Sequence, residues 1–174
     1  IKMAASLSKK HKNKYFVIFG SHPNKKHRIF NNSYLYASNL KTMVLQLKLK
    51  DRFIWGGFRE NIPELMSAID ILVHPCAVEG FGRIAIEAMA AGKPVVGPTT
   101  GGVSETVKNN FTGFLVKPGN VDLFAESTEK LILNEPLRNQ FGINARIHVR
   151  DSFSISTHVK TIQNIYESFN EKPK

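Results

Sequence analysis

The sequence predicts an α/β fold with a doubly wound, Rossmann-like parallel sheet, and three observations support this. Short apolar, β-branched runs alternate with longer helical stretches along the chain, which is the pattern of strands and helices around a parallel sheet. Glycine and proline residues mark many of the boundaries between them. The 174 residues, 42% of them hydrophobic, are enough to bury the core of one domain.

The expected elements follow in chain order. Strands are expected where apolar runs are short and end at a turn residue, as residues 71–74 end before Pro75. These strands are 15–19, 53–55, 70–74, 94–97 and 113–116. Helices are expected at 1–11, 33–48, 61–68, 82–91, 102–109, 121–133, 135–149 and 154–168. We expect one domain over residues 1–174, with 170–174 as a loose polar tail.

The most informative segment contains two carboxylates, Glu79 and Glu87, with seven residues between them. Gly80 and Gly82 allow the backbone to bend and to approach a ligand closely. A helix is expected to begin near Phe81 or Gly82 and to run to residue 91. The order is therefore strand, glycine loop and helix, and ligands of parallel sheets bind at such carboxyl ends of strands.

The start of this helix is a candidate anion site. Its first N–H groups, from Gly82 through Arg83 to Ile84, have no partner within the helix, and the helix dipole favours a phosphate there. Glu87 lies roughly 7.5 Å along the axis, where its carboxylate can accept two hydrogen bonds from a ribose diol. Glu79 stays on the loop, where it can face a sugar beyond the phosphates.

A structural interpretation of the same residues stays open. Arg83 and Glu87 are four residues apart, so they can form an ordinary ion pair on the surface of a helix. The rest of that helix is apolar nearly all round, which is typical of a buried helix, and a buried acid needs partners. Spacing alone does not decide between the two interpretations.

The single cysteine and the histidines indicate neither a disulfide nor a metal site. Cys76 cannot form a disulfide within the chain, which fits a reducing cytoplasm. We expect its thiol to be packed or to line a loop rather than to act as a nucleophile. The six histidines show no i, i+4 pair and no cysteine pattern. His74, at the end of a strand, either touches the ligand or is satisfied structurally.

Charge is distributed unevenly along the chain. Residues 1–60 carry 13 Lys and Arg against 2 Asp and Glu, whereas residues 61–174 carry 11 against 12. A basic half fits diphosphate steering, an anionic membrane surface or nucleic acid. We expect no nucleic-acid binding, because the aromatic residues Tyr15, Phe16, Phe19, Phe53 and Trp55 lie in strand-like runs and are expected in the core. Residues 24–28 are the candidate membrane contact.

The sequence around Glu79 and Glu87 resembles a known family. The residues from Glu79 to Glu87 and their flanks are similar to the C-terminal, donor-binding domain of retaining glycosyltransferases with two facing Rossmann domains, the GT-B type of group 1, family 4. The resemblance covers nearly the whole chain. It is carried by Glu79-Gly80-Phe81-Gly82-Arg83-Ile84-Ala85-Ile86-Glu87, by Glu87-Ala88-Met89-Ala90-Ala91-Gly92-Lys93-Pro94-Val95-Val96, by Gly101-Gly102-Val103-Ser104-Glu105, and by residues 112–120, 15–20 and 52–57.

The resemblance implies a role for each matching position. Glu87 would hold the ribose of a nucleotide-sugar, and Glu79 would contact the transferred sugar and is the residue assigned to catalysis. Backbone N–H groups from Gly80, Phe81, Gly82, Arg83 and Ile84 would lie near the sugar and the diphosphate, and a stretch including Gly57 would border the base. The resemblance implies no metal and no cofactor besides the nucleotide-sugar donor.

The chain also departs from the family pattern. The family domain opens with a strand and a loop whose Arg and Lys neutralise the diphosphate, whereas this sequence begins in what resembles the following helix. Cys76 stands where the family has a serine. We therefore expect a sheet without its first strand, which would leave a gap between 15–19 and 70–74. We expect one of three consequences of this gap: the chain is marginally stable, it self-associates, or the two strands pair directly and close the gap.

The sequence-based hypothesis is thus the donor-binding half of a retaining glycosyltransferase. Its acceptor is expected to be a carbohydrate or a lipid-linked sugar, bound by a further acceptor-binding domain or subunit. We expect a cytoplasmic protein, with contact at the inner face of the membrane as one option. The alternatives are a non-catalytic nucleotide-sugar-binding module, a subunit of a split enzyme and, third, a basic membrane- or nucleic-acid-binding protein.

Overall fold

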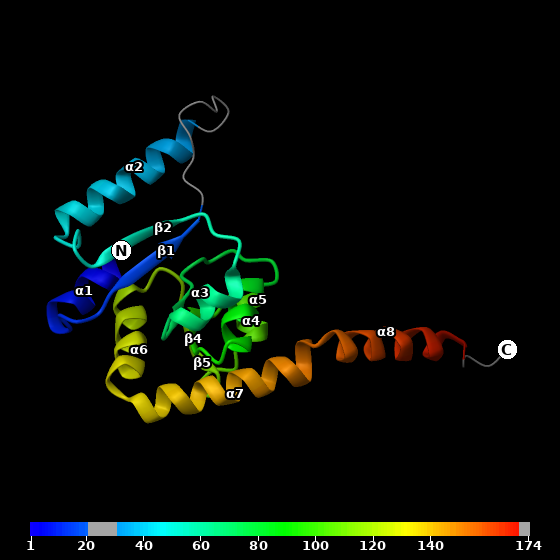
Figure 1. Cartoon of the computed structure of the whole chain (residues 1–174). Helices are drawn as coiled ribbons and strands as arrows, with labels where there is room; N and C mark the ends of the chain where they lie inside the picture. The colour runs from blue at the N-terminus through cyan, green and yellow to red at the C-terminus, as the bar shows by residue number, and fades with distance from the viewer. Residues whose placement is uncertain (21–30, 171–174) are drawn as a thin grey trace.

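The structure is a computed structural model that describes residues 1–20 and 31–170 (Figure 1). Its strands are β1 (Phe16–Phe19), β2 (Phe53–Gly57), β3 (Leu72–Val73), β4 (Val95–Pro98) and β5 (Gly113–Val116). Its helices are α1 (Lys2–Lys10), α2 (Asn31–Gln46), α3 (Ile62–Ala68), α4 (Arg83–Ala90), α5 (Gly102–Thr106), α6 (Val121–Leu133), α7 (Glu135–Phe153) and α8 (Ile155–Asn170).

Every expected element is present in the expected order, and the differences lie at the ends. The strand expected over 70–74 is shortened to the two residues of β3, since Pro75 has no N–H to extend the ladder. Helix α7 continues to Phe153, where Ser154 has an extended backbone and its hydroxyl accepts a hydrogen bond from the N–H of Thr157. Asn170, the first residue of the tail expected over 170–174, is the last residue of α8. Residues 171–174 of that tail and the basic stretch 24–28 lie outside the described residues.

The strands form two parallel sheets, in the orders β1-β2 and β3-β4-β5. This confirms the α/β fold class with parallel strands. Among the described residues β1 pairs with β2 and β3 pairs with β4. Strands 15–19 and 70–74 therefore do not pair with each other, and the two sheets remain separate. The expected gap is not closed by direct pairing.

The apolar side chains of β1 are largely uncovered. Val17, Ile18 and Phe19 are all exposed, and so is Tyr15 just before the strand. The expectation that the aromatic residues of this region belong to the core is thus wrong for Tyr15 and Phe19. It is right for Phe53, which is buried, because α1 and α2 cover that side of the small sheet.

The main core surrounds the three-stranded sheet. All four residues of β4 are buried, since β4 has strands on both sides and helices on its faces. Helices α4, α5 and α7 cover one part of this core, and α6 covers another. The largest fully buried side chains here include Met89, Val95, Val96, Val103 and Leu131.

Helix α1 is attached to the main core through α6. Lys10 Nζ lies 2.9 Å from Glu129 Oε2, and His11 Nε2 lies 2.7 Å from Glu129 Oε1. These hydrogen bonds from Lys10 and His11 lower the pKa of the Glu129 carboxyl. Lys9 and Lys12 are exposed to solvent.

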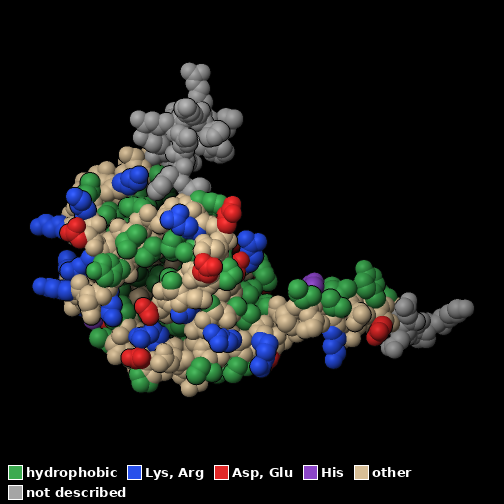
Figure 2. Space-filling view, in the orientation of Figure 1, with side chains coloured by type: hydrophobic (Ala, Val, Ile, Leu, Met, Phe, Trp, Pro, Cys, Tyr) green, Lys and Arg blue, Asp and Glu red, His purple; other side chains and the backbone are tan. Residues whose placement is uncertain are grey.

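Helix α8 projects away from the rest of the chain at the opposite end (Figure 1). Figure 2 shows apolar side chains along it. The exposed apolar residues of α8 are Ile155, Val159, Ile162, Ile165, Tyr166 and Phe169. No helix of the described part of the chain is long and apolar enough to cross a membrane.

Candidate functional site

The candidate site is built on the loop that joins β3 to α4. The loop begins where the His74 N–H donates to the carbonyl of Val96 at 2.9 Å. The Thr100 hydroxyl donates to the carbonyl of Ala77 at 2.8 Å, and the Gly102 N–H donates to that of Glu79 at 2.9 Å. The segment that follows β4 therefore holds the loop in place along its length.

Two glycines make this close approach possible. Gly82 caps α4 with a left-handed backbone, φ 77°, and a Cβ there would lie 2.8 Å from Val103 Cγ2. A Cβ on Gly102 would lie 2.4 Å from the carbonyl oxygen of Gly80. Only glycine fits at either position without a shift of the backbone.

Helix α4 begins one residue after Gly82, close to the predicted start, and its end is also close to prediction. The chain leaves it through Gly92 with φ 74°, as expected for a left-handed stop. The N-cap residue Gly82 has no side chain to cap α4, so the first N–H groups of the helix are left beside the glycine loop. Gly80 and Phe81 are exposed there, while Ile84 is half-buried.

Glu87 forms an ion pair with Arg83. This pair was the structural interpretation of the four-residue spacing between them. Glu87 Oε1 lies 3.0 Å from Arg83 Nε, and the two side chains are 31% and 85% exposed. An exposed pair of this kind contributes only about 0.3–0.5 kcal/mol. The pair therefore holds Arg83 weakly and leaves the second oxygen of Glu87 available to another donor.

Glu87 also lines a cavity of about 460 Å³ between α3, α4 and α7. This volume falls in the usual range of ligand pockets. Its lining residues are Ile62, Pro63, Ser67, Glu87, Ala90, Ala91 and Arg146. Ile62 and Pro63 begin the helix that follows β2, so the cavity lies between that helix and α4 and α7 of the main core. Gly57 ends β2 with φ 69° and is half-buried.

Glu79 lies on the loop, as predicted, and faces the end of β3. Its Oε2 is 3.4 Å from His74 Nε2, and the two side chains are 33% and 16% exposed. Cys76 is exposed on the same loop, and its thiol donates to the carbonyl of Val78 at 3.2 Å. The Cys76 thiol was expected either to be packed or to line a loop, and it lies on the loop. The grouping of these three side chains was not predicted, because no i, i+4 pattern joins them.

Arg146 was missed by the sequence analysis. It comes from α7, and its Nη2 donates to the carbonyl of Ala91 at 3.3 Å, at the end of α4. It brings a positive charge to the cavity that contains Glu87. The sequence carries no local signal for this contact, because the two residues are 55 positions apart.

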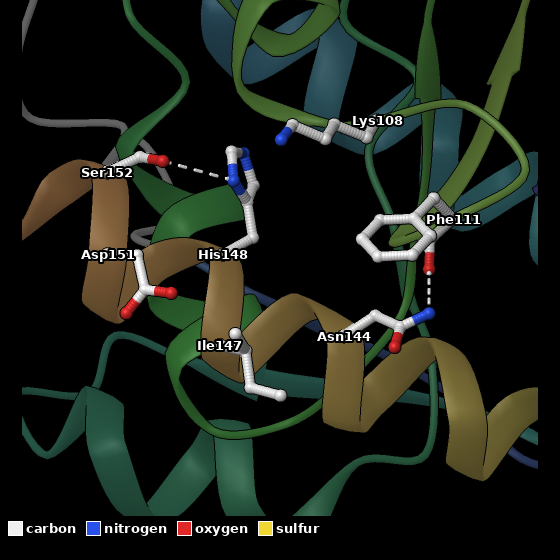
Figure 3. Close-up of a pocket in the computed structure, with 7 residues that line it drawn as sticks. All are labelled: Lys108, Phe111, Asn144, Ile147, His148, Asp151 and Ser152. Atoms are coloured by element: carbon white, nitrogen blue, oxygen red, sulfur yellow. Dashed lines mark hydrogen bonds between the residues drawn. The ribbon is translucent and has the colours of Figure 1, made fainter.

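A second, smaller cavity of about 180 Å³ lies between α7 and the segment after α5 (Figure 3). His148 is buried at its wall, where its Nε2 lies 3.1 Å from the Thr106 carbonyl and its Nδ1 lies 3.2 Å from the Ser152 hydroxyl. Burial lowers the pKa of His148 and nearby Lys108 lowers it further, while the hydrogen bond to Thr106 and the charge of Asp151 oppose the shift.

Comparison with known proteins decides the family. Residues 1–148 match the family model described as glycosyl transferases group 1. The chain belongs to the group 1 glycosyltransferases. This confirms the resemblance seen in the sequence.

Curated relatives in this glycosyltransferase family support the assignment. The chain is 33% identical over 141 residues to a capsular polysaccharide biosynthesis glycosyltransferase of Staphylococcus aureus, covering 81% of this chain and 34% of that protein. It is 31% identical over 124 residues to N-acetyl-alpha-D-glucosaminyl L-malate synthase of Bacillus anthracis, covering 71% of this chain and 32% of that protein. The chain thus spans about a third of the length of these relatives.

Solved structures confirm the fold of this group 1 glycosyltransferase chain. It is similar to the C-terminal domain of a glycosyl transferase group 1 family protein from Francisella tularensis, with a TM-score of 0.79, 27% identity, and coverage of 88% of this chain and 77% of that one. It is also similar to Anabaena HepE in complex with UDP, with a TM-score of 0.78, 25% identity, and coverage of 95% and 52%.

Proposed function

We propose that this chain is the donor-binding part of a glycosyltransferase that moves a sugar from a nucleotide-sugar to an acceptor with retention of configuration. The observation that carries the proposal is that the Glu79 loop, the start of α4 and Glu87 follow one another on one segment, with Glu87 at the wall of a cavity. These features offer, in sequence, an acceptor for sugar hydroxyls, donors for phosphate and an acceptor for a diol. A nucleoside diphosphate sugar carries the complementary groups in the same order.

In this proposal each part of the donor has its own contact. The free oxygen of Glu87 accepts from the ribose, and the N–H groups at the start of α4 donate to the diphosphate. Arg83, which is highly exposed, can turn from Glu87 toward the phosphates at little cost. Glu79 accepts hydrogen bonds from the transferred sugar, and Gly57 borders the base.

The proposed chemistry needs only these groups and the acceptor. The acceptor hydroxyl attacks the sugar carbon from the face that the diphosphate leaves, so the new bond keeps the configuration of the old one. The helix start and Arg83 stabilise negative charge as it develops on the departing diphosphate. We propose that transfer itself proceeds without a metal ion or a cofactor.

An acceptor-binding domain or subunit completes the proposed enzyme. The uncovered apolar residues of β1 and of α8 support it, since both surfaces are of the kind that other protein surfaces cover. The capsular polysaccharide relative favours a carbohydrate or lipid-linked acceptor. Such an acceptor would place the protein in the cytoplasm at the inner face of the membrane.

The decisive experiment measures UDP binding by titration calorimetry, because HepE was solved with UDP. Replacing Glu87 with Gln should weaken UDP binding by about 1.5–3 kcal/mol, the usual contribution of hydrogen bonds to a charged group. Glu126→Gln is the matched control, because Glu126 is exposed on α6, away from the cavity. If Glu87→Gln and the control bind UDP equally well, Glu87 is only the partner of Arg83.

Glu79 should respond differently if it contacts the sugar. With the acceptor-binding part supplied, Glu79→Ala should reduce the rate of sugar transfer far more than it reduces UDP binding. Equal losses in both assays would place Glu79 in nucleotide binding or in folding instead. Donor binding by the complete protein with no transfer to any acceptor would favour the alternative, a non-catalytic nucleotide-sugar-binding module.

A further inference from the structure

Three side chains on the β3–α4 loop have the composition of a metal site. His74, Cys76 and Glu79 each present one ligand atom, and these atoms all lie within 4.8 Å of one another. They form the only such group among residues 1–20 and 31–170. Nitrogen, sulfur and carboxylate oxygen together are the ligand set that Zn²⁺ takes in proteins.

The geometry of His74 fits a ligand better than a hydrogen-bonding role. Its Nε2 is buried and makes no hydrogen bond with any described residue, although it lies 3.4 Å from Glu79 Oε2. Two ligands about 2.1 Å from one tetrahedral zinc ion lie roughly 3.4 Å apart. The spacing of His74 and Glu79 is therefore that of two ligands sharing one ion, while a buried ring nitrogen without a partner is costly.

The rest of the loop holds these ligands in position. His74 is fixed by its backbone hydrogen bond to β4, and Glu79 by the hydrogen bond from Gly102 to its carbonyl. Between them the Ala77 carbonyl accepts from Thr100. Cys76 stays exposed and donates its thiol proton only to the Val78 carbonyl at 3.2 Å, so it can turn toward an ion without disturbing the core.

We propose that His74 Nε2, Cys76 Sγ and the Glu79 carboxylate bind one Zn²⁺ ion, with a water molecule in the fourth position. The Cys76 thiol loses its proton to solvent when the Zn–S bond forms. Because the ion takes the Glu79 carboxylate, zinc competes with the donor sugar for the site. This consequence rests on the proposed function, whereas the metal site itself does not.

Cobalt absorption tests the metal site on the chain as it exists. Co²⁺ substitutes for Zn²⁺, and a thiolate bound to it gives a charge-transfer band in the near ultraviolet. Since Cys76 is the only cysteine of the chain, such a band identifies it as a ligand without ambiguity. We expect the band on adding Co²⁺ and its loss when Zn²⁺ is added.

Single substitutions then test each ligand. His74→Ala, Cys76→Ala and Glu79→Gln should each weaken zinc binding tenfold or more in competition with a colorimetric chelator. His158→Ala is the matched control, because His158 is exposed on α8, and it should bind zinc as the unchanged chain does. Circular dichroism should show that all four variants remain folded. The absence of the cobalt band, or equal zinc affinity in the three variants and the control, would overturn the site.

Competition with the nucleotide separates this proposal from the function. Saturating zinc should weaken the binding of UDP-glucose more than that of UDP, because only the former places a sugar at Glu79. Equal effects on both would refute the competition. A chain that binds zinc through these three residues but binds neither nucleotide would support the metal site and contradict the proposed function.

Discussion

The two sheets of this chain differ in how well their strands are covered. In the three-stranded sheet β4 is buried along its whole length, and the helices around it share one continuous core. In the two-stranded sheet only Phe53 is buried, while three of the four residues of β1 are exposed. Side chains point above and below a sheet, so they are buried where helices lie on its faces, as they do around β4. Most side chains of β1 have no such cover among the described residues.

This difference shows which part of the chain can support a site. The loop that contains Glu79, and the helix that contains Glu87, begin and end on the well-covered sheet. Backbone hydrogen bonds from the segment after β4 hold the loop, so its geometry does not depend on β1 or β2. The lining residues of the main cavity include none from β1 or β2, and α3, which follows β2, contributes Ile62, Pro63 and Ser67.

A matched pair of valine substitutions should expose the largest difference. Val95 is fully buried in β4, whereas Val17 in β1 is 42% exposed. Val95→Ala should lower the free energy of unfolding by roughly 2 kcal/mol or more, because it removes buried methyl groups and leaves a cavity. Val17→Ala should lower it by about 1 kcal/mol or less. Urea unfolding of both variants measures this, and equal losses would contradict the contrast between the sheets.

The open side of β1 should also promote self-association. An exposed apolar edge strand pairs readily with other strands, and a lysine at such an edge prevents this. Sedimentation velocity over a range of concentrations should show the chain associating, and Ile18→Lys should shift it toward monomer. An unchanged chain that stays monomeric at every concentration would show that β1 is not an adhesive edge.

The smallest expected effect is a difference in the response to acid. The pKa of His148 in the folded chain lies below the unfolded value of about 6.5. The unfolded chain therefore takes up the proton first, and the stability from neutral His148 is lost as pH falls from that value toward the folded pKa. His148→Gln should flatten this part of the stability profile, measured by urea unfolding at a series of pH values.

The attachment of α1 should respond in a lower pH window. The pKa of Glu129 is lowered by Lys10 and His11, so the stability it contributes is present above its unfolded pKa and lost as pH falls through the folded one. Glu129→Gln should flatten the profile below about pH 4.5. If instead His148→Gln changed only the profile below about pH 4.5 and Glu129→Gln only the region near pH 6, the assignment of the two pH windows to these residues would be wrong.

The order of the elements and the position of the Glu79–Glu87 segment could be predicted from the amino-acid sequence alone. Strand length, helix periodicity and stops such as Pro75 and Gly92 are local properties, so they can be read within a short window of residues. The glycines of the loop could be predicted for the same reason, because a left-handed backbone at Gly82 depends on the residue itself.

Contacts between residues far apart in the chain could not be predicted and became visible in the folded structure. The separation of β1 from β3, the arrival of Arg146 at the end of α4, and the close approach of His74 to Glu79 depend on packing or loop conformation. None of them leaves a periodic or spacing signal, since a contact between distant residues is set by the whole path of the chain between them. The exposure of Tyr15 and Phe19 was mispredicted for this reason, because an apolar strand residue is buried only if something lies against it.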